Sequence, residues 1–66
     1  MNTDRLEEFR ALAHILNYSK TAEQLFLSQS ILSRHIQELE QSLGVTLFLR
    51  DTHDVVLTDE GKYLLR

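Results

Sequence analysis

The chain has 66 residues, a formal net charge of −3, a hydrophobic fraction of 42% and no cysteine. This length suits one small domain with its own core, and the absence of thiols excludes both a disulfide framework and a thiolate zinc site. No apolar run reaches the roughly 18 residues of a membrane span, and the N-terminus lacks a secretory signal pattern, so we expect a cytoplasmic protein.

The first predicted helix covers about residues 4–16. Its apolar side chains recur at helical spacing and form one stripe: Leu6, Phe9, Leu12, Ala13 and Leu16. Thr3 and Asp4 are both good N-cap residues, and Asp4 has capping-box spacing to Glu7. The stripe indicates a helix that packs on a core. The neighbouring carboxylates of Glu7 and Glu8 are interpreted as solvated.

A short second helix follows, with Ser19 as its predicted N-cap. Its buried face is expected to hold Ala22, Leu25 and Phe26. Leu27 and Ser28 then form a tight polar turn into the next helix. Two helices joined in this way are typical of a helix-turn-helix.

The third predicted helix, about residues 29–43, has Ser28 as its N-cap and ends at Gly44. Its apolar stripe consists of Leu32, Ile36, Leu39 and Leu43. About 120° away by helical geometry lies a second set: Gln29, Ser30, Ser33, Arg34 and Gln37. These amides, hydroxyls and a guanidinium, with no carboxylate, are the side chains that read base edges and phosphates. The pattern predicts a recognition helix for DNA.

Residues 45–50 and 55–57 are rich in β-forming side chains and flank a polar tetrapeptide, which predicts a short hairpin. Thr58 is expected to cap a last helix, with Asp59 and Glu60 in the first turn, where acids suit the helix dipole. The whole order predicts a mainly α fold: a winged helix-turn-helix with a three-helix core, a hairpin wing and the start of a linker helix.

These residues resemble the N-terminal DNA-binding domain of LysR-type transcriptional regulators over residues 4–66. The matching motifs are Tyr18-Ser19 with Thr21-Ala22, Ser28-Gln29, Ser33-Arg34, Ile36 with Leu39-Glu40, Leu43-Gly44, Leu47-Phe48 with Arg50, and Leu57-Thr58 with Gly61. Threonine stands at position 21, where the family has the first alanine of a pair. So many ordered matches at fixed spacing are highly specific, whereas a helix-turn-helix pattern alone would not be.

The resemblance implies a DNA-binding domain over residues 1–58, with helix 29–43 in the major groove and wing 47–57 on the flanking backbone or minor groove. Residues 59–66 would begin a truncated linker helix that dimerises the full-length protein, and a small-molecule effector would bind a missing C-terminal domain. No cofactor is expected. The predicted DNA-binding residues are Ser28, Gln29, Ser30, Ser33, Arg34, Gln37, Arg50 and His53.

Several positions have competing interpretations. Gln29 could instead satisfy exposed N–H groups of its own helix. Glu40 and Arg50 could pair with each other between helix and wing. His53 and Asp54 stand where relatives commonly carry arginine, which places a minor-groove contact by the wing in doubt. Ile31 replaces a usually small residue, and the sequence leaves open whether it enters the core or touches a thymine methyl group.

The acidic net charge is unusual for a DNA-binding module. Residues 28–37, however, carry a net charge of +1 from Arg34 and form the one positive block of the chain. An alternative is a winged helix used for protein–protein contact, without DNA binding. An enzyme is not expected, since the three histidines have no metal-ligand spacing and neither a phosphate loop nor a nucleophile motif is present.

Overall fold

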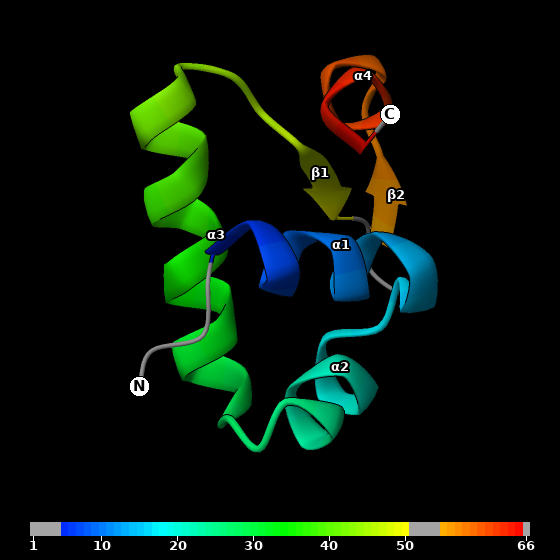
Figure 1. The fold of residues 1–66 in the computed structure, drawn as a ribbon, viewed down its shortest axis with the longest axis vertical. Coiled ribbons are helices and arrows are strands. Elements are labelled where there is room, and N and C mark those ends of the chain that lie inside the picture. The colour runs from blue at the N-terminus through cyan, green and yellow to red at the C-terminus, as the bar shows by residue number, and fades with distance from the viewer. Residues whose placement is uncertain (1–4, 51–54, 66) are drawn as a thin grey trace.

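The computed structural model describes residues 5–50 and 55–65. These residues form the helices and strands α1 (Arg5–Ile15), α2 (Tyr18–Gln24), α3 (Gln29–Leu43), β1 (Phe48–Arg50), β2 (Val55–Leu57) and α4 (Asp59–Leu65). The strands pair antiparallel, with Phe48 opposite Leu57 and Arg50 opposite Val55. In Figure 1, α3 runs along one side, α1 crosses the middle, and α4 lies beside the hairpin. The predicted winged helix-turn-helix is confirmed.

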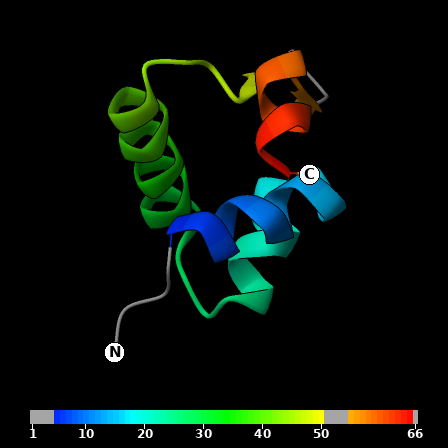
Figure 2. The same ribbon diagram turned by 45° about the horizontal axis from the view of Figure 1, so that its top comes forward.

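One hydrophobic core joins the three N-terminal helices to the wing. Phe9 and Leu12 of α1, Leu32 and Ile36 of α3 and Leu47 before β1 are almost completely buried. The rings of Phe9 and Phe48 lie 5.5 Å apart between centroids. In Figures 1 and 2, α1 begins beside α3 and runs beneath the hairpin and α4, and it contacts both α3 and α4. The apolar stripes predicted for the first and third helices therefore face the same core.

Helix capping follows the sequence prediction at α3 and α4 but not at α2. The Ser28 hydroxyl accepts a hydrogen bond from the Ile31 N–H at 3.1 Å, and the Thr58 hydroxyl accepts one from the Gly61 N–H at 3.0 Å. At α2 the predicted cap, Ser19, is wrong. Asn17 has the extended backbone of a cap, and its side-chain oxygen accepts from the Lys20 N–H at 2.9 Å. Ser19 consequently lies inside the first turn.

Two apolar residues predicted to be buried are instead exposed where helices end. Leu16 and Phe26 have φ angles of 55° and 58°, so each follows its helix in the left-handed conformation. Helical spacing no longer applies beyond such a residue. Leu16 is 39% exposed and Phe26 is 94% exposed. Leu6, in the first turn of α1, is also exposed, at 43%, despite its place on the predicted stripe.

The segment from α3 to the wing is fixed by a carboxylate. Glu40 accepts hydrogen bonds from the backbone N–H groups of Leu47 and Phe48, at 2.8 and 3.2 Å. The alternative in which Glu40 pairs with Arg50 is not found among the described residues; the carboxylate binds backbone donors before β1 instead. Gly44 ends α3 in the left-handed conformation, with a φ angle of 72°, and the sequence predicted the helix end at this residue.

Gly61→Ala is expected to destabilise the domain by about 1–2 kcal/mol. A Cβ atom at this buried position would lie 2.6 Å from both the Leu47 carbonyl oxygen and the Leu57 Cδ1 atom. The overpacking cost exceeds the gain of up to about 1 kcal/mol from replacing glycine in a helix. Urea unfolding of both proteins measures the difference, and a more stable variant would show that α4 can move away from the hairpin.

Candidate nucleic-acid interface

The outer face of α3 and the end of β1 border an open hollow of about 490 Å³. Its lining consists of six of the eight residues that the sequence predicted as DNA contacts: Gln29, Ser30, Ser33, Arg34, Gln37 and Arg50. Two guanidinium groups, two amides and two hydroxyls thus share one surface, and none of the described residues that line it carries a carboxylate. Such a surface can donate hydrogen bonds to phosphate oxygens and to base edges. His53 lies outside the described residues.

The opposite face of α3 holds the helix in the core. Leu32 and Ile36 are buried, with 0% and 1% exposure, and Leu39 packs against the core in a half-buried position. Leu43, the last residue of the predicted stripe, is 46% exposed because it lies at the helix end beside the groove to α4. Ile31 is half-buried. The separation of the apolar and polar faces is what leaves the polar face free for a ligand.

Gln29, at the start of α3, is tied to α2. The Ser19 hydroxyl donates a hydrogen bond to the Gln29 side-chain oxygen at 3.0 Å. Gln29 also lines a second hollow of about 360 Å³, together with Ser19 and Lys20. Its amide therefore lies between the hollow beside β1 and the hollow beside α2. It does not take the alternative role of accepting from the first N–H groups of α3; the N–H group of Ile31 is bound by Ser28.

Arg50 is positioned by an aromatic ring that the sequence did not link to it. The guanidinium carbon lies 4.1 Å from the centroid of the Tyr18 ring, at the start of α2. A cation over the face of an aromatic ring is held electrostatically and with restricted freedom. Tyr18 itself is buried. The contact places the charge of Arg50 next to the polar face of α3. In the sequence, the only indication of this contact was an aromatic residue at the start of α2.

Alkaline solution is expected to destabilise the wild type more than Tyr18→Phe. Burial raises the pKa of the Tyr18 phenol above 10.0, while the nearby Arg50 lowers it and Glu40 raises it. A raised pKa in the folded state means that the unfolded chain ionises first. The contribution of Tyr18 to stability is thus fully present below the pKa of the phenol in the unfolded chain, and it is lost as the pH rises through the pKa in the folded state. Urea unfolding at about pH 9 and about pH 11 tests this, with Tyr63→Phe as the control at an exposed phenol.

A buried carboxylate beneath α3 was not predicted. Glu8, interpreted from sequence as solvated, has 0% exposure, and its Oε1 atom lies 2.8 Å from Nδ1 of His35. Its Oε2 atom has no hydrogen-bond partner among the described residues. The interpretation of Glu8 is wrong because α1 crosses α3 at this point and covers the carboxylate. The pair connects α1 directly to the recognition helix, next to Arg34.

A second, exposed contact joins the same two helices. Arg5 donates a hydrogen bond to the Glu38 carboxylate at 2.9 Å. That hydrogen bond is the main reason why the pKa of Glu38 is lowered from its ordinary value, with the charges of Arg5, Arg34 and His35 acting in the same direction. Because both side chains are well exposed, the pair contributes little to stability.

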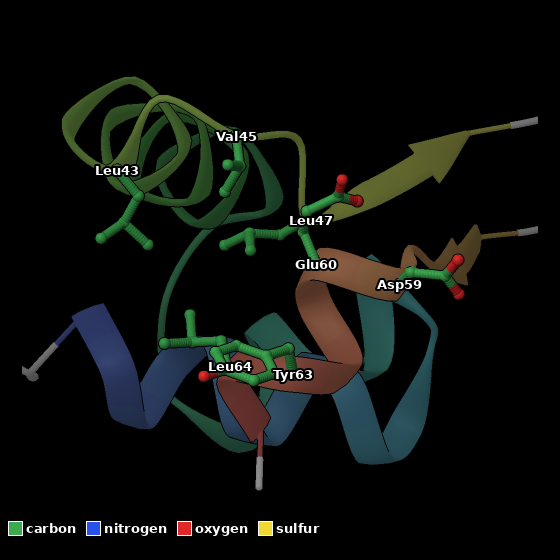
Figure 3. A pocket seen from close by; sticks show the side chains of 7 residues that line it. All are labelled: Leu43, Val45, Leu47, Asp59, Glu60, Tyr63 and Leu64. Carbon is green, nitrogen blue, oxygen red and sulfur yellow. The ribbon is translucent and has the colours of Figure 1, made fainter.

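An apolar groove of about 430 Å³ lies apart from this polar surface, between the end of α3 and α4. Figure 3 shows Leu43 and Val45 facing Tyr63 and Leu64 across it, with Leu47 at one end. In residues 5–50 and 55–65, no cluster of potential metal ligands is found. Within the same ranges, none of the helices has the length and apolar character needed to cross a membrane.

Comparison with known proteins agrees with this architecture. Residues 3–62 match the family of bacterial regulatory helix-turn-helix proteins of the lysR type. The chain is 48% identical, over 61 residues, to the HTH-type transcriptional activator IlvY of Haemophilus influenzae, covering 92% of this chain and 21% of that protein. It is 47% identical to the HTH-type transcriptional regulator XapR of Escherichia coli, covering 91% of this chain and 20% of that protein. The chain thus spans about a fifth of the length of these curated relatives.

Solved structures give the same result. A LysR-family transcriptional regulator from Eggerthella lenta superposes with a TM-score of 0.87 at 38% identity, covering 97% of this chain and 91% of that one. A CbnR_DBD–DNA complex superposes with a TM-score of 0.90 at 35% identity, covering 98% of this chain and 75% of that one. By its family match, its similar sequences and its fold, the chain belongs to the lysR family of bacterial regulatory helix-turn-helix proteins.

Proposed function

We propose that this chain is the DNA-binding domain of a LysR-type transcriptional regulator and that it binds double-stranded DNA sequence-specifically. The observation that carries the proposal is the polar hollow between α3 and β1, whose described lining consists of two arginines, two glutamines and two serines. In this proposal α3 enters the major groove, and the wing contacts the flanking backbone or minor groove.

Each predicted contact has a distinct role in this proposal. Arg34 and Gln37 reach base edges or phosphates from the middle of α3, and Ser30 and Ser33 contribute hydroxyls near its start. Arg50, stacked on Tyr18, meets a phosphate from the side of the wing. The proposed surface also includes Gln29, His53 and Ser28, the N-cap residue of α3. Lys20, missed in the sequence, is exposed beside Gln29 and is suited to a phosphate.

The relatives support this assignment. The similar structures include complexes with DNA, among them those of CbnR_DBD and of BenM_DBD with a catB site, the latter with a TM-score of 0.89 at 35% identity. We further propose a homodimer in the full-length protein, in which residues 59–66 begin the dimerising linker helix. A small-molecule effector would bind outside residues 1–66, and the regulator would act in the bacterial cytoplasm without catalytic activity.

Because the net charge of the chain is −3, its overall charge does not attract DNA, and the affinity must come from the local surface. Fluorescence anisotropy with an A·T-rich duplex at low and moderate salt tests the proposal. We expect binding that weakens as salt rises, with a log–log slope of about 0.9 per neutralised phosphate. Absence of binding at both salt concentrations would contradict the proposal and favour a protein-interaction module.

A further inference from the structure

Ser19 has no structural task within α2. The cap position is taken by Asn17, whose side-chain oxygen accepts from the Lys20 N–H. The Ser19 side chain is exposed, and its hydroxyl makes one hydrogen bond in the described part of the chain, to the Gln29 side-chain oxygen at 3.0 Å. Removing this hydroxyl therefore leaves the helix cap and the core intact.

The same hydrogen bond engages the oxygen end of the Gln29 amide. Because the oxygen accepts from Ser19, it is held toward α2. The side-chain amide is planar, so the NH₂ group occupies its other arm and donates to no group within residues 5–50 and 55–65. Gln29 lines the polar hollow that also contains Arg34. At this position the protein thus presents the NH₂ group of Gln29 as a hydrogen-bond donor, while the side-chain oxygen already accepts from Ser19.

Bases differ in how they match such a side chain. A glutamine that pairs bidentately with adenine must turn its oxygen and its NH₂ group to the base edge together, because adenine offers one donor and one acceptor in the major groove. Guanine offers two acceptors there, and thymine offers a carbonyl oxygen. A glutamine whose oxygen is held toward α2 can still donate to guanine or thymine. With adenine it loses one of the two hydrogen bonds, the one that its oxygen would accept.

We infer that Ser19 is a positioning residue, which fixes the Gln29 amide as a donor and thereby selects guanine or thymine over adenine at the base that Gln29 reads. The inference rests on the proposed function, since it requires α3 to lie in the major groove. It assigns a specificity role to a residue of α2 that need not touch a base.

Selection of bound duplexes from a random pool by the full-length protein tests this inference. Four proteins are compared: wild type, Gln29→Ala, Ser19→Ala and Ser19→Thr. The base read by Gln29 is the one whose preference Gln29→Ala loses. In the wild type we expect guanine or thymine there. In Ser19→Ala the ratio of that base to adenine should fall by about threefold to tenfold, the equivalent of one hydrogen bond.

Ser19→Thr keeps the hydroxyl and should keep the wild-type preference, and the melting temperature of Ser19→Ala should be unchanged. A wild-type preference for adenine, an unchanged profile in Ser19→Ala, or equal profiles in the threonine and alanine variants would each overturn the inference. So would an unaltered profile in Gln29→Ala, which leaves the proposed function standing. If none of the four proteins enriches any sequence, the proposed function fails and the inference falls with it.

Discussion

Arg34→Ala is expected to weaken the binding of duplex DNA by about 1–3 kcal/mol while leaving the stability of the domain unchanged. Arg34 is exposed on α3 and lines the polar hollow, and it makes no contribution to the core beneath. A guanidinium that faces a groove contributes to the complex and not to the fold. Titration by fluorescence anisotropy measures the first effect, and thermal unfolding measures the second.

Arg10→Ala is the matched control for this prediction. Arg10 is also exposed, but it lies on α1 and does not line the hollow. Both variants remove one positive charge, so a loss caused by net charge alone would be equal in the two. If Arg34→Ala bound DNA as well as Arg10→Ala, the polar face of α3 would not be the binding face.

The fold could be predicted from sequence because its main signals are local. The spacing of Leu32 and Ile36 fixes which face of α3 enters the core, and the polar arc that includes Arg34 then points away from it by geometry alone. Ser28 and Gly44 mark the helix ends with residues suited to those backbone conformations. Five of the six predicted contacts that line the hollow lie on α3 and follow from the same periodicity, whereas the sixth, Arg50, comes from β1.

The remaining features depend on backbone conformation or on contacts between distant segments. Asn17 and Ser19 are equally good caps, and only the observed start of α2 decides between them. The left-handed backbone of Phe26 turns its ring outward, whereas helical spacing placed it in the core. The pair of Arg50 with Tyr18 is a long-range contact, which no spacing rule within one element can predict.

The pair of Glu8 with His35 is a further long-range contact, and it leads to the largest expected change in stability. His35→Ala should destabilise the domain by about 1–3 kcal/mol, the cost of leaving a buried polar group without its hydrogen-bond partner. The substitution removes the sole hydrogen-bond partner that the described residues provide for a carboxylate with 0% exposure. A buried carboxyl group that loses its hydrogen-bond partner keeps its desolvation cost without compensation. Urea unfolding monitored by circular dichroism measures the loss.

A double variant separates this effect from simple loss of packing. Replacing both members, as Glu8→Met with His35→Leu, removes the charge together with its partner and fills the space between α1 and α3 with apolar atoms. Because paired replacements of this kind are often neutral or stabilising, the double variant should recover most of the stability lost in His35→Ala. If it were as unstable as His35→Ala, the loss would come from packing around residue 35. A cost of less than about 1 kcal/mol for His35→Ala would contradict the prediction. It would mean that water enters between α1 and α3 and solvates the Glu8 carboxylate, so that the burial of Glu8 does not fix the position of α3.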